Sequence, residues 1–206
     1  MEREKETSVA YFIDLLLLFL TRPAEAMRQI RKHPSSLAAL IALLLTGVSE
    51  AVSFRLLDVV GILTSAGFTS QMIENISKVQ RAPGTFWTLV SEPFFLVMFS
   101  VAIIDGFARL FWKRTAARSL YISLSMSGLV GAVLRMCGLL MAGVAGGVIL
   151  DLCAYGAMVY MLVLGVLAVK SFYEKSTARA TALYLLPTVL GMAALVALTL
   201  AVGGAA

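Results

Sequence analysis

Charged residues are scarce in this sequence of 206 residues. Asp, Glu, Lys and Arg make up 14% of the chain, against about a quarter of a typical soluble domain. Hydrophobic residues reach 60%, and the mean hydropathy is +0.90. A single soluble core cannot bury so much apolar surface, so lipid must solvate the remainder. The composition therefore predicts an all-α, polytopic membrane bundle rather than a soluble enzyme.

Residues that usually carry chemistry are also few. The chain has one histidine, His33, and two cysteines, Cys137 and Cys153, which are both set in apolar sequence. Neither a disulfide framework nor a metal-ligand cluster is indicated, and we expect both cysteines to be buried free thiols. The sequence contains no nucleophile elbow, phosphate-binding glycine loop, Cys-x-x-Cys or His-Glu-x-x-His motif. We expect no enzyme activity, no cofactor and no metal site.

The N-terminal segment, residues 1–34, combines a short apolar run with a basic helix. Residues 9–20 are too few to cross about 30 Å of hydrocarbon, which takes roughly 20 helical residues, so this run should lie on the membrane or pack against the bundle. Residues 24–31 have the pattern of an amphipathic interfacial helix. Basic residues around it are candidates for contacts with anionic lipid headgroups: Arg22, Arg28, Arg31 and Lys32.

Residues 35–206 carry apolar stretches that are long enough to cross a bilayer as helices. The five predicted spans cover about residues 37–57, 89–112, 119–141, 148–169 and 180–202. Pro93 is expected in the first turn of the second span, where proline is tolerated. Residues 58–88 predict a polar loop with one surface helix, and the glycines at 143, 146 and 147 predict a tight turn.

The basic residues indicate how the chain is oriented, since cytoplasmic loops retain Lys and Arg. The N-terminal segment and residues 113–118 and 170–179 are basic, whereas residues 58–88 carry no net charge. We expect the N-terminus in the cytoplasm and the C-terminus outside, in the cell (inner or cytoplasmic) membrane. Because the basic residues are scattered among apolar runs, the net charge of +5 does not predict a nucleic-acid partner.

Two charged residues are expected deep within the spans. At about 1.5 Å per residue, Glu50 lies roughly 20 Å along the first span and Arg135 roughly 24 Å along the third, so their depths match. Burying one charge in hydrocarbon costs roughly 2.5 to 3.5 kcal/mol, so each needs a partner. We hypothesise that the two pair, and that Glu92, Asp151 and Arg55 surround them in a water-reachable pocket in the outer half of the membrane. The alternative is that these charges only hold helices together or extend to the headgroups.

Two further patterns favour structural roles. Asp105 and Arg109 stand four residues apart near the cytoplasmic end of the second span, a spacing that allows an ion pair. Small or polar residues recur at every fourth position of the third span: Ser119, Ser123, Ser127 and Gly131. Such a face favours close helix packing, with a polar pathway as the alternative.

Several stretches of the chain carry a family resemblance. Residues 17–34 (LLFLTRPAEAMRQIRKHP) form a proline-bounded amphipathic opening ahead of the first span. Further stretches are ARL at 108–110, LYIS at 120–123, VLGVL at 163–167 and KSTARA at 175–180. Together they resemble the Yip domain family, the Ypt/Rab-interacting membrane proteins, in its prokaryotic branch. The resemblance covers most of the chain and implies five spans with the N-terminus inside. Eukaryotic members of that family are associated with Rab GTPases, vesicle trafficking and membrane shaping.

The function expected from the sequence is that of a Yip-type integral membrane protein, a non-enzymatic scaffold that organises membrane or recruits partners. The alternative is a small transporter, channel or lipid-moving protein that uses the charged pocket of the outer half. Membrane lipids are the expected partners. The sequence also allows membrane or cytoplasmic protein partners and a homo-oligomer.

Overall fold

The computed structural model describes residues 9–57, 64, 67, 69–145 and 147–203, except for the side chains of residues 143–145, 195 and 198–203. The described part is helical and contains no strand, as the composition predicts. The helices are α2 (Val9–Thr21), α3 (Pro23–Lys32), α4 (Ser36–Leu56), α6 (Ser70–Arg81), α7 (Pro83–Trp112), α8 (Ala117–Ala145), α9 (Gly147–Tyr173) and α10 (Thr177–Gly203).

Four helices in the described part are long and apolar enough to cross a bilayer: α4, α7, α9 and the Ala117–Ala142 part of α8. The chain is therefore a multi-pass membrane protein. The helix α2 is apolar but has only 13 residues, too few to cross. The helix α10 matches the predicted fifth span, but part of its side chains lies outside the described residues, and a fifth crossing stays a prediction.

Two predicted helix boundaries were wrong. The helix α7 begins at Pro83 instead of about residue 89, so Pro93 lies inside it and is buried. A membrane helix tolerates such a proline when neighbouring helices pack against the break, because only the Leu89 carbonyl loses its partner. The predicted glycine turn is also shorter, since α8 stays helical through Ala145. Helical backbone satisfies its own hydrogen bonds, which lipid cannot do for a loop.

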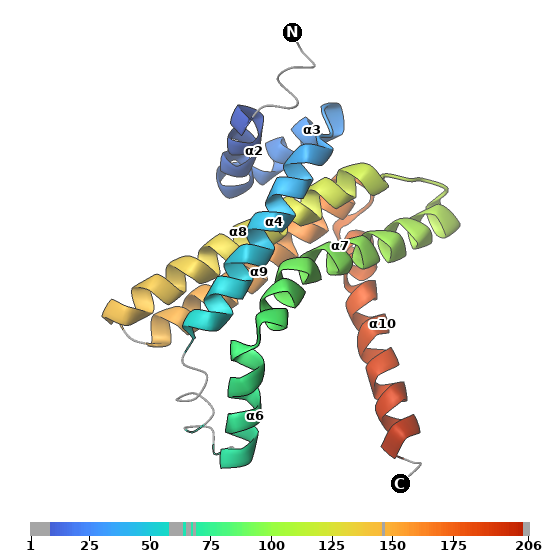
Figure 1. Cartoon of the computed structure of the whole chain (residues 1–206). Helices are drawn as coiled ribbons and strands as arrows, with labels where there is room; N and C mark the ends of the chain where they lie inside the picture. The colour runs from blue at the N-terminus through green and yellow to red at the C-terminus, as the bar shows by residue number, and fades with distance from the viewer. Residues whose placement is uncertain (1–8, 58–63, 65–66, 68, 146, 204–206) are drawn as a thin grey trace.

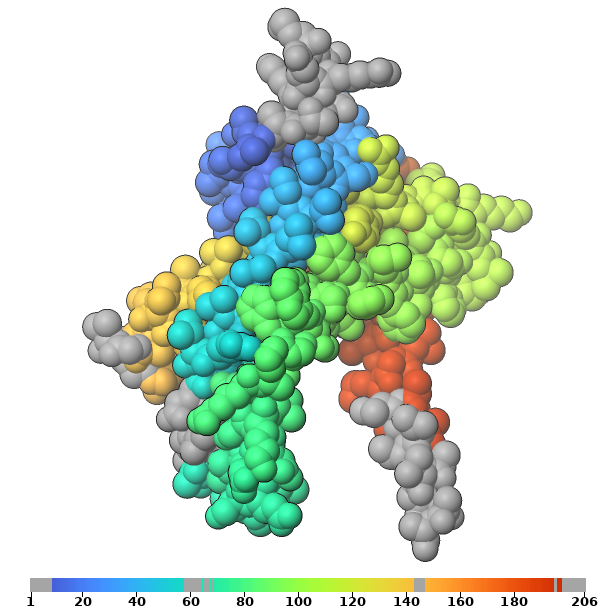
Figure 2. All heavy atoms as spheres, viewed as in Figure 1, coloured from blue at the N-terminus to red at the C-terminus, as the bar shows by residue number. Residues whose placement is uncertain are grey.

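The helix α8 is the most buried of the candidate spans, and α9 runs antiparallel beside it (Figure 1). The helix α4 packs on α8, and α7 crosses α4. At that crossing Gly47 faces the backbone of Val90, and a Cβ at Gly47 would overlap it. Glycine therefore allows the two helices to approach closely. The first turns of α10 pack on α9 and α7, after which α10 stands apart from the other helices (Figures 1 and 2).

The N-terminal helices pack against the bundle, one of the two arrangements that the short apolar run predicts. One side of α2 is buried, and so is one side of α3: Tyr11, Phe12, Leu15, Phe19, Ala26, Met27 and Ile30. The Ser123 hydroxyl donates to the Met27 sulfur over 3.1 Å, so α3 rests on the small face of α8. Ser123 and Ser127 are buried there, as close packing predicts.

The two cysteines differ in their surroundings. Both are free, but Cys137 is exposed and Cys153 is half-buried. The expectation that both are buried was therefore wrong for Cys137 and met only in part for Cys153. Lipid-facing positions of a membrane helix are as apolar as its packed positions. An apolar neighbourhood in the sequence therefore does not show whether a cysteine is packed or faces lipid.

Candidate functional site

The two ends of the bundle differ in their charged residues. We call the end that carries the turns at residues 113–116 and 174–176 the basic end, and the opposite end, where α4 finishes and α8 turns into α9, the far end. At the far end the predicted ion pair is present: Nη2 of Arg135 on α8 donates to Oε1 of Glu50 on α4. About a third of each side chain is exposed, 33% for Arg135 and 32% for Glu50. The pair is therefore only partly enclosed by protein.

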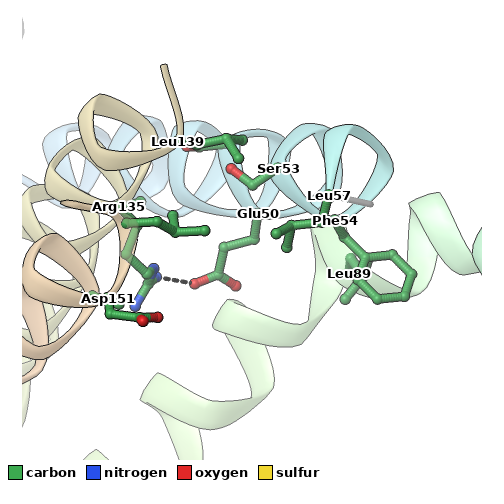
Figure 3. A pocket seen from close by; sticks show the side chains of 12 residues that line it. Glu50, Ser53, Phe54, Leu57, Leu89, Arg135, Leu139 and Asp151 are labelled. Atoms are coloured by element: carbon green, nitrogen blue, oxygen red, sulfur yellow. Dashed lines mark hydrogen bonds and ion pairs between the residues drawn. The ribbon is translucent and has the colours of Figure 1, made fainter. Parts of the chain in front are cut away.

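A cavity of about 430 Å³ lies beside this ion pair, between α4, α7, α8 and α9 (Figure 3). Glu50, Arg135 and Asp151 supply its charges, and the remaining walls are mostly apolar. Those walls are formed by Ser49, Ser53, Phe54, Leu57, Leu89, Ala132, Leu139, Leu150 and Ala154. The structure thus brings together three of the five residues that the sequence placed in one pocket.

The other two predicted members, Glu92 and Arg55, do not line the cavity. The Arg55 guanidinium lies over the Phe86 ring, 5.7 Å from its centroid. Stacking on an aromatic face satisfies this cation near the end of α4 without a carboxylate. Glu92 is near enough to Glu50 for the two carboxylates to repel each other. It therefore adds negative potential without forming the wall.

The helix α6 supplies hydrogen bonds to the carbonyl groups at the far end of α4. The Gln80 side-chain amide donates to the carbonyl oxygens of Phe54, over 2.6 Å, and Leu57, over 3.1 Å. These carbonyls belong to the last turn of α4, where no helical partner remains. Phe54 and Leu57 also line the cavity, so Gln80 ties α6 to its wall. The sequence analysis missed this contact, because a polar residue at position 80 does not by itself indicate its partner.

At the basic end, Asp105 is buried and fully used by protein donors. Its carboxylate accepts hydrogen bonds from Arg109 (2.7 Å), Thr115 (2.9 Å), the Ala116 backbone N–H (2.8 Å) and Tyr173 (2.7 Å). The predicted ion pair with Arg109 is confirmed, but Thr115 and Tyr173 were missed. Spacing within one helix predicts the first contact only, because the others come from a turn and from α9.

A second carboxylate at this end, Glu174, bridges two cations. It accepts from Arg31 of α3 over 2.6 Å and from Arg114 over 2.5 Å. These hydrogen bonds and charges, with Arg114 contributing most, lower the pKa of Glu174 to about 2. The carboxylate therefore stays ionised at any ordinary pH. It links α3 to the turn before α8 and the turn after α9, which both lie at the basic end.

The four predicted lipid-contacting residues fall into two groups. Arg31 is held by Glu174, and Arg22 lies 3.6 Å from Glu25. Arg28 and Lys32 are exposed, and neither has an ion pair within the described part of the chain. They are thus the members of the set whose charge the protein leaves for other partners.

Residues 9–57, 64, 67, 69–145 and 147–203 contain no group of three or more His, Cys, Asp or Glu side chains that could hold a metal ion. The far end presents one guanidinium, two carboxylates and a mostly hydrocarbon wall to a ligand. The basic end presents exposed cations. No family model, no curated protein and no solved structure matches this chain.

Proposed function

We propose that this chain is a non-enzymatic, Yip-type scaffold that organises the cell membrane by inserting an anchored wedge into its cytoplasmic leaflet. The wedge consists of α2 and α3, residues 9–32, and the basic end faces the cytoplasm. The observation that carries the proposal is the way α2 is held. Its buried side packs on the bundle, while its other side is exposed and mostly apolar.

The exposed side of α2 fits the acyl region of one leaflet. Its apolar members are Val9, Ile13, Leu17 and Leu20, and the exposed Asp14 lies among them. Water would make such a face costly, and 13 helical residues reach only about 20 Å, so α2 cannot extend through both leaflets. The acyl region of a single leaflet suits both the apolar exposed side and the short length of α2.

A hydrogen bond supports this depth. The Tyr160 hydroxyl of α9 donates to the Phe19 carbonyl, 2.7 Å away, where α2 ends. Tyr160 precedes the basic end of α9 by 13 residues, or about 20 Å. The whole of α9 is about 40 Å long, some 10 Å more than the hydrocarbon layer. The end of α2 therefore lies below the headgroups, and the Phe19 carbonyl in its last turn is satisfied by protein, as lipid requires.

The helix α3 adds the electrostatic part. Its buried side rests on the bundle, and Arg28 and Lys32 point away from it. Each basic residue near an anionic surface contributes about 1 kcal/mol of attraction. The buried side of α3 and the ion pair of Arg31 with Glu174 together hold α3 to the bundle. A rigid volume confined to one leaflet favours curvature of that membrane.

Vesicle shape tests the proposal. The protein is reconstituted at increasing protein-to-lipid ratio into vesicles that contain anionic lipid, and vesicle diameters are measured by electron cryomicroscopy. We expect smaller vesicles or tubules with the wild-type chain. The double variant Ile13→Ser and Leu17→Ser removes the lipid-facing side of α2 without touching the core, and it should lose this effect.

The matched control is Val159→Ser and Val163→Ser, which changes two exposed apolar residues at the same spacing on a crossing helix. This control should shape vesicles as the wild type does. The proposal fails if the wild-type chain leaves vesicle diameter unchanged at every ratio. It also fails if the α2 variant and the control behave alike.

A second candidate is a small transporter, channel or lipid-moving protein, because the cavity at the far end touches the ion pair of Glu50 and Arg135. Charges at membrane depth often mark a substrate path. The test is movement of a fluorescent lipid or of protons across proteoliposomes. The double variant Glu50→Leu and Arg135→Leu removes both charges together, and it should abolish transport if this candidate is correct.

A further inference from the structure

The far-end cavity has the dimensions of a ligand site. Its volume of about 430 Å³ falls in the range of about 300 to 1,000 Å³ that holds small molecules in proteins. Most of its wall is apolar, and its charged groups gather at one place, where Glu50, Arg135 and Asp151 meet. A ligand that fits must therefore have one charged part and one apolar part.

The charges of the cavity do not balance. Two carboxylates, Glu50 and Asp151, face one cation, Arg135, and Glu92 adds further negative potential nearby. Asp151 is exposed and has no ion pair within the described residues. An ammonium group beside Asp151 would pair with this free carboxylate, because opposite charges attract strongly in surroundings of low dielectric.

Arg135 offers an additional contact. The structure gives its guanidinium one hydrogen bond, to Glu50, although the group carries five N–H donors. Figure 3 shows it between Glu50 and Asp151, at the side of the cavity. The remaining donors suit a phosphate, which guanidinium groups bind in a fork geometry. A phosphate and an ammonium side by side match the cation and the free carboxylate of this site.

The backbone supplies a further acceptor. Pro93 lacks an N–H, so the carbonyl of Leu89, four residues earlier, has no helical partner. Leu89 lines the cavity. A ligand ammonium is a donor that could satisfy this carbonyl.

We propose that this cavity binds a zwitterionic phospholipid with an ammonium headgroup, of the phosphatidylethanolamine class. The ammonium lies against Asp151, the phosphate meets Arg135, and the upper acyl chains cover the apolar wall. A bilayer presents such lipids at the mouth of any cavity that opens between its helices. This inference goes beyond the wedge, since it needs no membrane bending and concerns the opposite end of the bundle.

Native mass spectrometry of the detergent-purified chain tests the site. The protein is titrated with an equimolar mixture of phosphatidylethanolamine and phosphatidylglycerol, and bound lipids are counted by mass. We expect the ethanolamine lipid to be preferred about fivefold, as for one ion pair of about 1 kcal/mol. A matched lipid, N-acetyl phosphatidylethanolamine, keeps the phosphate but has no ammonium, and it should lose the preference.

Two variants locate the preference. Asp151→Asn should abolish it, and the fold should persist because Asp151 has no ion pair among the described residues. Ala154→Phe fills the cavity and should reduce binding of either lipid. Glu74→Gln changes an exposed carboxylate on α6 away from the cavity and serves as the control. Melting temperatures establish that each variant is folded.

Three results would overturn the proposal. The first is equal binding of phosphatidylethanolamine and its N-acetyl derivative by the wild-type chain, which requires no variant. The second is a preference that survives in Asp151→Asn. The third is unchanged binding in a folded Ala154→Phe protein, because the lipid would then sit elsewhere.

Discussion

Asp105 and Asp151 lie at opposite ends of the bundle, and the protein treats them differently. Asp105 is buried and accepts hydrogen bonds from four residues drawn from α7, the following turn and α9. Asp151 is exposed at the edge of a cavity and has no ion pair within the described residues. The comparison teaches that the partners of a membrane carboxylate distinguish a structural role from a binding role, whereas its position in a span does not.

The ion pair of Glu50 and Arg135 stands between these extremes. Each partner neutralises the other, yet both side chains remain about one third exposed at the cavity. Such a pair can hold α4 to α8 and still meet a ligand. The first two predictions therefore compare the structural cost of losing a charged side chain at the two ends.

The largest effect is expected at Asp105. In Asp105→Ala the hydroxyls of Tyr173 and Thr115 and the Ala116 N–H lose their acceptor. We expect the free energy of unfolding to fall by about 3 kcal/mol or more, the cost of breaking a buried charged network. Denaturant unfolding of the detergent-solubilised chain measures the change. Asp151→Ala is the matched control and should stay within about 0.5 kcal/mol; equal losses in the two variants would remove the distinction between the ends.

A smaller loss is expected for Arg135→Leu. The variant leaves Glu50 without its cation inside the membrane, at a cost of about 2 to 3 kcal/mol. The double variant Glu50→Leu and Arg135→Leu removes both charges and should recover most of that stability. A double-mutant cycle on unfolding free energies measures the coupling. Additive losses would mean that the two side chains do not stabilise each other.

Tyr173→Phe should have a moderate effect. The variant deletes the 2.7 Å hydrogen bond to Asp105 but keeps the ring against Trp112. A loss of about 1.5 kcal/mol is expected, the lower end of the range for a hydrogen bond to a charged acceptor. The exposed Tyr155→Phe provides the comparison and should leave the melting temperature unchanged. Matching shifts in the two variants would contradict the importance of the Asp105 network.

The smallest effect is expected at Glu174, which is open to solvent. Its pKa is lowered to about 2 from an ordinary 4.5, so its stabilising contribution is complete above pH 4.5 and is lost as the pH falls toward 2. Melting temperature should therefore not depend on this group between pH 5 and 8. Glu174→Gln should lower it slightly at pH 7, and salt should reduce the difference. A steep change in the difference between the two proteins near neutral pH would contradict the low pKa.

The sequence predicted some contacts well and others not at all. Depth along a helix follows from counting residues, so the pairing of Glu50 with Arg135 was predictable. The same counting overextended the pocket, because Arg55 finds an aromatic partner instead. Gln80 and Tyr173 were missed since their partners come from other helices, and no periodicity within one segment encodes such contacts. The start of α7 was misplaced because proline is tolerated inside a packed membrane helix.

Carbodiimide coupling in vesicles of phosphatidylethanolamine tests the difference between the two ends most directly. The reagent joins a carboxylate to a lipid amine that touches it, and mass spectrometry of peptides locates the amide. The account predicts lipid adducts on Asp151, with Glu50 as a lesser site, and far fewer on Asp105 or on the exposed Glu74. Adducts spread evenly over exposed carboxylates, or none on Asp151, would contradict a lipid site at the far end.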